Sequence, residues 1–206
     1  MKSKTYKMEN IQGTDVYLLD QMMKGRYLPS DKILDAGCGG GRNMRWFALN
    51  NYSVYGCDLN QEAMTYAQKH TDLGSEKFKV SAVEEMPYDN LEFDHVICNA
   101  VLHFANNEQH FLAMVSEQDR VLKSGGTLFV RMTSTFGLPE NYQLIGEGRY
   151  LLADGTERFL LTKDLLTKVK TVGFELVEPV KSVLVEELRS MTTLVLRKLD
   201  ESTFSS

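Results

Sequence analysis

The sequence predicts a three-layer αβα sandwich around a mostly parallel, seven-stranded sheet. Two observations lead to this fold class. Short apolar runs alternate with amphipathic helical patterns, which is typical of strands joined by helical crossovers. The last two apolar runs have no helix between them, so we expect a hairpin with one antiparallel strand near the carboxyl terminus.

Each element follows from a pattern in the chain. Strands are expected where apolar, β-branched or aromatic residues cluster in short runs, and helices where apolar residues recur every three or four positions. The expected strands cover residues 32–36, 53–57, 78–82, 93–100, 127–132, 174–184 and 192–199. Helices are expected at residues 14–24 and 108–122 and after the caps Asn43, Asn60 and Thr162. Such side chains accept a hydrogen bond from a free N–H at a helix start. Gly125-Gly126 and Gly173 are expected to end the last two helices.

Length and charge limit the classes of protein that fit. The chain has 206 residues, a net charge of −5 and 43% apolar residues, which suffices for one sizeable core. We expect a single domain over residues 1–200, followed by a flexible tail at 201–206. No apolar run approaches the roughly 20 residues of a membrane span, and no apolar signal core follows the first residues. The sequence predicts a cytoplasmic protein without a membrane or nucleic-acid partner, and leaves its oligomeric state open.

The three cysteines, Cys38, Cys57 and Cys98, are too few and too widely spaced for a disulfide framework or a C-x-x-C metal site. Each closes an apolar run, which favours small buried residues beside strand ends over reactive thiols. The four histidines are scattered, so no metal site is expected. Free thiols also fit a reducing compartment.

The segment Leu34-Asp35-Ala36-Gly37-Cys38-Gly39-Gly40-Gly41-Arg42-Asn43 carries most of the functional information. Glycines between a strand and a helix allow a sharp turn and let a ligand approach the main chain. In an open α/β sheet this turn lies at the edge where ligands bind. A nicotinamide fingerprint would need a third glycine where Arg42 or Met44 stands, and no phosphate-loop Gly-Lys-Ser/Thr follows.

This loop resembles the first motif of the class I S-adenosylmethionine-dependent methyltransferases, and the order of elements is similar from about Tyr27 to Met132. Within that family the chain looks most like the small-molecule group that includes tellurite-resistance-type enzymes. The resemblance implies a Rossmann-like fold and S-adenosylmethionine as cofactor. It places these residues at the methionine end of the cofactor: Asp35, Gly37, Cys38, Gly39, Asn43, Asn99 and Ala100.

The resemblance also implies how the rest of the cofactor is held. Asp58 would bind the ribose hydroxyls with both carboxylate oxygens, and Leu59 would pack on the adenine. Ala82 stands where the family often has an aspartate, so the backbone of Val83 or the carboxylate of Glu84 would have to reach the base. Structural alternatives remain for Asp35 as a turn cap, Asp58 at a helix start and Glu84 in a solvated turn.

The acceptor side has weaker signals. His103 stands where the family often places a histidine near the methyl group, so it is the candidate general base, with a structural histidine as the alternative. Residues 133–161 are too long for an ordinary connection and are expected to cover the substrate. Tyr17, Arg131 and Tyr150 are candidate substrate residues, and residues 1–26 a helical lid.

The sequence therefore predicts a methyltransferase that acts on a small molecule by in-line displacement. Such a reaction gains on the order of 7–11 kcal/mol from positioning in favourable cases, so a missing base would not argue against it. The alternatives are a binding module that keeps the cofactor but has lost catalysis, and a methyltransferase acting on a macromolecule. The net negative charge and the absence of an Asn-Pro-Pro-Tyr or Asp-Pro-Pro-Tyr segment after residue 98 stand against the latter.

Overall fold

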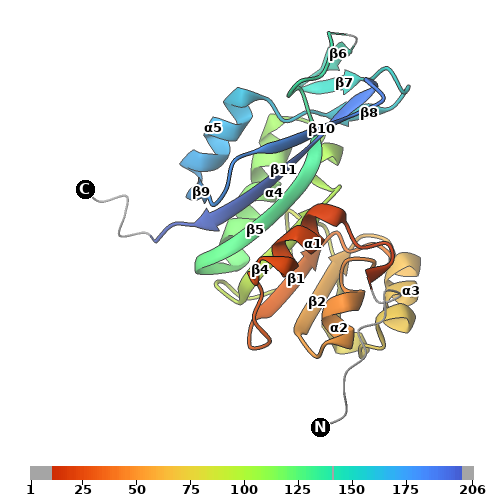
Figure 1. Cartoon of the computed structure of the whole chain (residues 1–206), viewed down its shortest axis with the longest axis vertical. Coiled ribbons are helices and arrows are strands. Elements are labelled where there is room, and N and C mark those ends of the chain that lie inside the picture. Colours follow the sequence, from red (N-terminus) through yellow and green to blue (C-terminus); the bar gives the residue numbers. More distant parts are fainter. Residues whose placement is uncertain (1–10, 141, 201–206) are drawn as a thin grey trace.

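The computed structural model describes residues 11–140 and 142–200, which fold around one large sheet (Figure 1). Its strands are β1 (Lys32–Ala36), β2 (Ser53–Asp58), β3 (Phe78–Val80), β4 (Phe93–Asn99), β5 (Leu122–Ser134), β9 (Phe174–Leu176), β10 (Lys181–Val185) and β11 (Arg189–Lys198). A second, three-stranded sheet contains β6 (Gln143–Gly146), β7 (Arg149–Leu151) and β8 (Glu157–Phe159). The helices are α1 (Val16–Met23), α2 (Arg45–Leu49), α3 (Gln61–Thr71), α4 (Glu108–Val121) and α5 (Lys163–Thr171), with short 3-10 helices η2 (Ser75–Lys77) and η3 (Leu102–Phe104).

The large sheet has the order β10-β11-β5-β4-β1-β2-β3. Strands β1 to β5 run parallel, and β11 is antiparallel to β5, β10 and β9. The predicted mostly parallel sheet with an antiparallel carboxyl-terminal strand is confirmed. The sheet has eight strands rather than seven, because the apolar run at 174–184 divides into β9 and β10. Pro179, which has no N–H to donate, lies in the break, and both short strands pair along β11.

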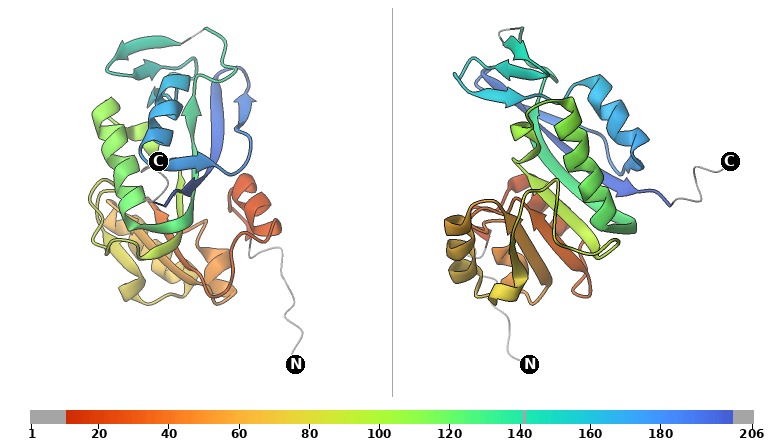
Figure 2. Two further views of the ribbon diagram at one scale, coloured as in Figure 1. Left: turned by 90° about the vertical axis from the view of Figure 1, so that its left-hand side faces the viewer. Right: turned by 180° about the vertical axis from the view of Figure 1, so that it is seen from behind.

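Alternate residues along the central strands face two different cores, as expected for a buried parallel sheet. The core under α4 and α5 contains Leu34, Val96 and Leu128. The core under α1, α2 and α3 contains Ile33 and Phe129, which are sequence neighbours of Leu34 and Leu128. Figure 2 shows α4 and α5 on one side of the sheet and α1 on the other. The three-layer arrangement is therefore confirmed.

Two of the three predicted helix caps are confirmed. Asn60 accepts hydrogen bonds from the N–H groups of Glu62 and Ala63 at the start of α3, and Thr162 accepts one from Leu165 at the start of α5. The cap at Asn43 is wrong, since α2 begins two residues later without any side-chain cap.

The predicted helix end at Gly125-Gly126 is also wrong. Helix α4 stops at Val121 and runs directly into β5, and the two glycines lie where the pairing of β5 with β4 shifts register. Gly125 has a φ of +75°, which suits this irregular stretch of strand. Gly173, by contrast, follows α5 and its C-cap residue Val172 with a φ of +129°, as expected for a helix end.

The described part of the amino-terminal region packs onto the sheet. Leu18 of α1 is fully buried in the core that contains Ile33 and Phe129. The backbone N–H of Asp15 donates to Asn43 Oδ1 at 3.1 Å. The predicted lid over residues 1–26 lies outside the described residues for its first ten positions, and so does the predicted tail at 201–206.

The long segment after Met132 forms β6, β7 and β8 around a small core of its own, made by Leu138, Leu152 and Leu160. Figure 1 shows these strands together at one end of the molecule. The segment returns to the large sheet where Leu161 bridges to Ser134. Among the residues described, no helix is long and apolar enough to span a membrane.

Candidate active site

The glycine loop between β1 and α2 has a backbone that only glycine accepts easily. Gly37, Gly39 and Gly41 have φ values of +75°, +51° and +76°. A Cβ atom on Gly37 would also lie 2.4 Å from a methyl group of Val101. The N–H groups of Gly37 and Cys38 both donate to the carbonyl oxygen of Cys57, at 2.8 and 2.9 Å, which fixes the loop against the end of β2.

Asp58, at the end of β2, joins the glycine loop to the start of α3. Its Oδ2 accepts a hydrogen bond from the N–H of Gly39 at 2.8 Å, and its Oδ1 accepts one from Asn60 at 2.9 Å. The helix-start role considered for Asp58 is therefore present. A carboxylate oxygen can accept more than one hydrogen bond, so these contacts leave capacity for the two hydroxyls of a ribose.

A cavity of about 350 Å³ opens beside this loop. It is lined by Gly37, Asp58, Leu59, Ser81, Val83, Glu84, Ala100, Val101, Phe104, His110 and Met114. The structure thus brings together six of the predicted cofactor residues from the ends of β1, β2 and β4 and from the turn after β3. One wall is apolar, with Val83 and Met114 buried and Leu59 72% exposed at the rim, which suits a flat aromatic base.

Glu84 lies in the wall of this cavity, where its Oε1 is 3.2 Å from Nε2 of His110. No pattern in the sequence pairs His110 with Glu84, which lies 26 positions earlier. Phe104 and Met114 are further lining residues that the sequence did not single out. These three residues reach the cavity from η3 and α4, and their positions depend on how those helices pack on the sheet.

Asp35 and Asn99 end neighbouring strands, and their polar atoms are buried without partners. Asp35 is 1% exposed and neither carboxylate oxygen has a hydrogen bond, and neither polar atom of the Asn99 side chain has one. Burial, together with the negative Asp58, raises the pKa of Asp35 to about 7, while Arg42 acts in the opposite direction. Buried polar groups are normally hydrogen-bonded, so this pair has the capacity that an ammonium and a carboxylate ligand would use. Neither residue lines the cavity, so a contact between this pair and the methionine end of S-adenosylmethionine stays a prediction.

Three other predicted cofactor residues make contacts within the protein. Sγ of Cys38 lies 3.5 Å from Sδ of Met64, the N–H of Gly39 is bonded to Asp58, and Oδ1 of Asn43 is bonded to Asp15. None of the three lines the cavity. Their contacts hold the loop on the side away from the cavity. A direct role for them in cofactor binding stays a prediction.

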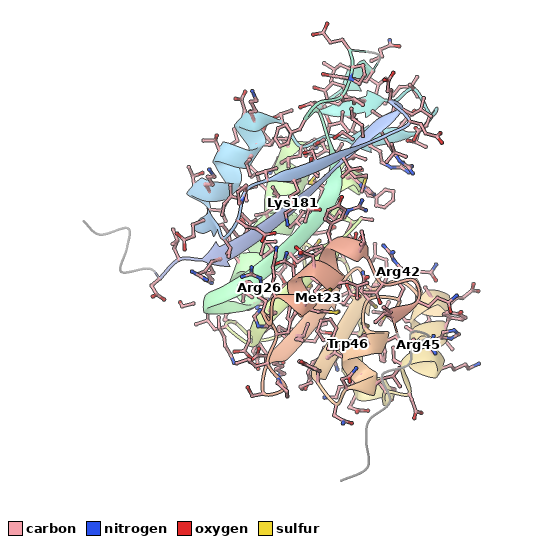
Figure 3. The ribbon with its side chains drawn as sticks, viewed as in Figure 1. Met23, Arg26, Arg42, Arg45, Trp46 and Lys181 are labelled. Carbon is pink, nitrogen blue, oxygen red and sulfur yellow. The ribbon has the colours of Figure 1, made fainter. Side chains whose placement is uncertain are left out.

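Arg42, which stands where a nicotinamide fingerprint would have glycine, ties the amino-terminal segment to the loop. Its Nη1 donates to the carbonyl oxygen of Gly13 at 3.1 Å, and Thr14 Oγ1 donates to its carbonyl oxygen at 3.3 Å. Figure 3 shows Arg42 beside the segment that leads into α1, with Arg45 lower on the same side. The glycine loop is thus covered from outside by residues 13–15.

The three thiols are buried, as predicted. Burial raises the pKa of Cys57 to about 12 and raises those of Cys38 and Cys98 well above their usual range. Since the thiolate is the reactive form, none of the three is a nucleophile at neutral pH. Within residues 11–140 and 142–200, no group of three or more His, Cys, Asp or Glu side chains is placed to hold a metal ion.

A second cavity, of about 260 Å³, meets the first at Ala100. It is lined by Ala100, His103, Arg131, Thr133, Thr156, Arg158, Val185, Arg189 and Met191. Ala100 has a φ of +63° and its N–H donates to the carbonyl oxygen of Arg131 at 2.8 Å, so the chain turns sharply between the two cavities. Thr133, Thr156 and Arg158 belong to the segment predicted to cover the substrate.

The predicted substrate residues separate in the structure. Arg131 lines the second cavity, and its Nη1 lies 3.2 Å from Asp15 Oδ2. Tyr17 does not line that cavity, but its ring lies 5.1 Å from the Arg131 guanidinium. Tyr150 lines a different cavity of about 550 Å³ between β6, β7, β8, α4 and α5, which shares no lining residue with the cofactor cavity. Tyr150 is therefore not placed with Arg131.

His103 lies in η3, 7% exposed, and its Nδ1 is buried without a hydrogen-bond partner. Burial lowers its pKa to about 4, and the positive charges of Arg158 and Arg189 act in the same direction. The imidazole is therefore neutral at neutral pH and carries a free acceptor or donor nitrogen. The other histidine expected to be structural in the sheet, His95, is indeed buried and bonded to Thr127 and Asp31.

Residues 34–130 match the model of a methyltransferase domain. An uncharacterized protein of Methanocaldococcus jannaschii is 26% identical over 162 residues, which cover 78% of this chain and 73% of that protein. The mitochondrial ubiquinone biosynthesis O-methyltransferase of Rattus norvegicus is 34% identical over 112 residues, 52% of this chain but 32% of that enzyme. The tRNA N(3)-cytidine methyltransferase METTL6 of the same species is 28% identical over 154 residues, 66% of this chain and 52% of that enzyme. The chain thus spans about a third to a half of the length of these two enzymes.

A solved structure with the same fold is that of a SAM-dependent methyltransferase from Methanosarcina mazei. Its TM-score is 0.74 at 24% identity, and the match covers 87% of this chain and 98% of the other. The domain match starts in β1, includes the glycine loop and Asp58, and ends in β5. With the cavity beside that loop, these findings identify the chain as carrying a class I S-adenosylmethionine-dependent methyltransferase domain.

Proposed function

We propose that the protein transfers the methyl group of S-adenosylmethionine to a small-molecule acceptor. The proposal rests on the observation that the cofactor cavity and the smaller second cavity share one lining residue, Ala100. A donor in the first cavity and an acceptor in the second would meet at this residue. Methyl transfer needs this kind of close, in-line approach more than it needs any one catalytic group.

The bound cofactor supplies an electrophilic methyl group on a sulfonium. The protein's own part is to hold and orient it. We infer that Asp35 and Asn99 bind the methionine end, and that Asp58 binds the ribose with the lone pairs that Gly39 and Asn60 leave free. Val83 and Leu59 pack on the adenine, and Glu84 lies within reach of its amine at the wall of the cavity.

His103 is the candidate for handling the acceptor's proton. Its neutral imidazole lies in the wall of the acceptor cavity. A pKa near 4 makes it a weak base, so it is better suited to orient the acceptor by a hydrogen bond than to remove a proton from a weakly acidic group. An acceptor whose nucleophile is already deprotonated would not need a base at all.

The small-molecule assignment is supported by the size of the second cavity and by the net charge. About 260 Å³ is below the usual size of a drug-binding pocket, and a net charge of −5 does not favour binding to a polyanion. Among the relatives, one is named a ubiquinone biosynthesis O-methyltransferase and another a tRNA N(3)-cytidine methyltransferase. We also propose a cytoplasmic location, in keeping with the three buried free thiols.

Ligand-induced stabilisation tests the cofactor assignment. In protein freed of bound ligand, S-adenosylmethionine or S-adenosylhomocysteine at about 100 times its Kd should add about 2.7 kcal/mol to the free energy of unfolding. The melting temperature should rise by about 5–10 °C. NAD, the matched adenine dinucleotide, should leave it unchanged. No rise with either adenosyl ligand would refute the assignment.

Turnover then separates the enzyme from a binding module. Release of S-adenosylhomocysteine is measured with a panel of small hydroxyl, amine and thiol compounds, and with tRNA as the macromolecular comparison. Turnover of a small compound supports the proposal. Binding of the cofactor without release on any acceptor supports a non-catalytic module, and release on tRNA alone supports a macromolecular substrate.

A further inference from the structure

The acceptor cavity contains an unusual concentration of positive charge. Three arginines from three strands line it: Arg131 on β5, Arg158 on β8 and Arg189 on β11. They come from positions up to 58 residues apart in the chain, so no local sequence motif indicates that they lie together. Two neighbouring carboxylates offset part of this charge, Asp15 at 3.2 Å from Arg131 and Asp154 at 3.5 Å from Arg189.

Within the described part of the chain Arg158 has no ion-pair partner of its own, although the carboxylate of Asp154 also interacts with its charge. Among the described residues, no carboxylate oxygen lies within 4 Å of its guanidinium, whose Nη1 donates to the carbonyl oxygen of Glu157 at 2.7 Å. The guanidinium also lies 5.1 Å from the centre of the Phe104 ring, a residue of the cofactor cavity. One net positive charge therefore lies in the cavity wall on the side where the two cavities meet.

His103 lies in the wall of the same cavity, where the charge of these arginines acts on it. Burial is the main cause of its low pKa, and the next causes are the positive charges of Arg158 and Arg189. The field therefore acts at the imidazole, inside the cavity wall. An anion bound between the two guanidinium groups would reverse this contribution.

We propose that the methyl acceptor carries an anionic group, a carboxylate or a phosphate, that Arg158 and Arg189 bind. This inference rests on the proposed function. The planar guanidinium matches both groups with two parallel hydrogen bonds, which fixes direction as well as charge. Arg131 is held by Asp15 and Tyr17, so it acts as a rigid wall of the same site.

The anion then orients the acceptor for the reaction. With its charged end at Arg158 and Arg189, the acceptor presents its nucleophile toward Ala100. The new bond forms between that nucleophile and the methyl carbon while the carbon–sulfur bond breaks, and sulfur keeps the electron pair. A proton carried by the nucleophile passes to water.

The first test measures anion binding without methyl transfer. The pKa of His103 is followed by NMR in the S-adenosylhomocysteine-loaded protein, with the signal assigned by His103→Gln, in the presence of inorganic phosphate or acetate. Either anion should raise the pKa of His103 from near 4 toward 5 in the wild type. The double variant Arg158→Gln/Arg189→Gln should start from a higher pKa and show no response to the anion.

Arg197→Gln is the matched control. Arg197 lies on β11 like Arg189, is 46% exposed where Arg189 is 45% exposed, and faces Glu175 away from the cavity. This variant should respond to phosphate and acetate as the wild type does. A stronger response to phosphate than to acetate would identify phosphate as the group that the site prefers, and the reverse would identify carboxylate. An unchanged His103 pKa with both anions in the wild type would overturn the proposal.

The second test compares acceptors in matched pairs, each a carboxylate and its primary amide with the same nucleophile. The carboxylate should have at least about a tenfold higher kcat/KM, since a hydrogen-bonded charged group contributes about 1.5–3 kcal/mol. The double variant should lose this preference and Arg197→Gln should keep it. Equal turnover of both members by the wild type would overturn the proposal. Failure to bind S-adenosylmethionine would instead overturn the proposed function, while the His103 titration, repeated without ligand, would still decide the anion site.

Discussion

The two cavities of this protein are built in different ways. The cofactor cavity is made of strand ends and tight turns, with Gly37, Asp58 and Ala100 held by main-chain hydrogen bonds. The second cavity, which we propose binds the acceptor, has several long side chains in its wall, among which Arg158 and Arg189 come from strands outside the parallel part of the large sheet. Main-chain geometry tolerates little change, whereas long side chains can be exchanged without altering the fold. Substitutions of these side chains would therefore change which acceptor is bound without altering the site for the methyl donor.

This comparison predicts that substitutions around the cofactor cavity lower both stability and function, whereas substitutions around the second cavity lower function alone.

The largest expected effect is at Asp35. Burial raises its pKa from 3.8 to about 7, so the folded protein favours the protonated form. The stabilisation is complete below pH 4 and is lost as the pH rises through 7. The loss should approach about 4 kcal/mol at pH 8 in the ligand-free protein.

Because the stabilisation declines progressively between pH 4 and pH 7, urea unfolding at pH 5 and pH 8 should differ by about 2.6 kcal/mol of this loss. Asp35→Asn should be less sensitive to pH over that range and should bind S-adenosylmethionine more weakly. Asp94→Asn, at the opposite edge of the sheet, is the control, because its pKa is lowered rather than raised. Equal pH dependence in the wild type and Asp35→Asn would show that Asp35 is not strained by burial.

The next largest effect is expected at Gly37. Gly37→Ala places a Cβ at a φ of +75° and within 2.4 Å of Val101, so it should lower stability by about 2–4 kcal/mol. Gly25→Ala has a similar φ of +69° but nothing within 4 Å, and should cost about 1–2 kcal/mol. Thermal and urea unfolding of the two variants give the difference. Equal losses would mean that Val101 moves aside freely.

At Asp58 we expect a moderate effect on cofactor affinity. Asp58→Ala should weaken binding of S-adenosylmethionine by about 1.5–3 kcal/mol, which is roughly 10- to 150-fold in Kd. Calorimetric titration measures it, with Asp94→Ala as the control. Asp58→Asn preserves the shape of the side chain and tests whether the charge is needed. Unchanged affinity in Asp58→Ala would refute the ribose assignment.

The smallest effect is expected at Tyr17, on the acceptor side. Its ring lies 5.1 Å from the Arg131 guanidinium, and Tyr17→Leu should cost about 0.5–1 kcal/mol through loss of this cation–π contact. The KM for the acceptor should rise a fewfold with kcat unchanged. Tyr66→Leu, on the exposed side of α3, is the control and should leave KM as it is. A loss of stability as large as that at Gly37 would contradict the contrast between the two halves.

The cofactor half could be predicted because its signals are local. The glycines, Asp58 and the strand ends follow from short apolar runs and from backbone conformations that few residues adopt, and both are visible in neighbouring letters. Ala100 could be placed because it directly follows β4, and Val83 and Glu84 because they lie in the turn after β3. The predicted helix cap at Asn43 was wrong because its side chain accepts a hydrogen bond from the N–H of Asp15, 28 residues earlier. No local pattern in the sequence reveals that bond.

Only the tertiary structure decided the acceptor half. The second sheet, the division of the edge strand at Pro179 and the meeting of Arg131, Arg158 and Arg189 depend on contacts between distant parts of the chain. The cavity of about 550 Å³ lined by Tyr150 shares no lining residue with the cofactor cavity or the second cavity. By itself the sequence determined the fold class and the parallel core, since strand and turn propensities act between neighbouring residues, and the resemblance of its glycine loop to a known family indicated the donor. The shape and charge of the acceptor site arise from side chains that packing alone brings together.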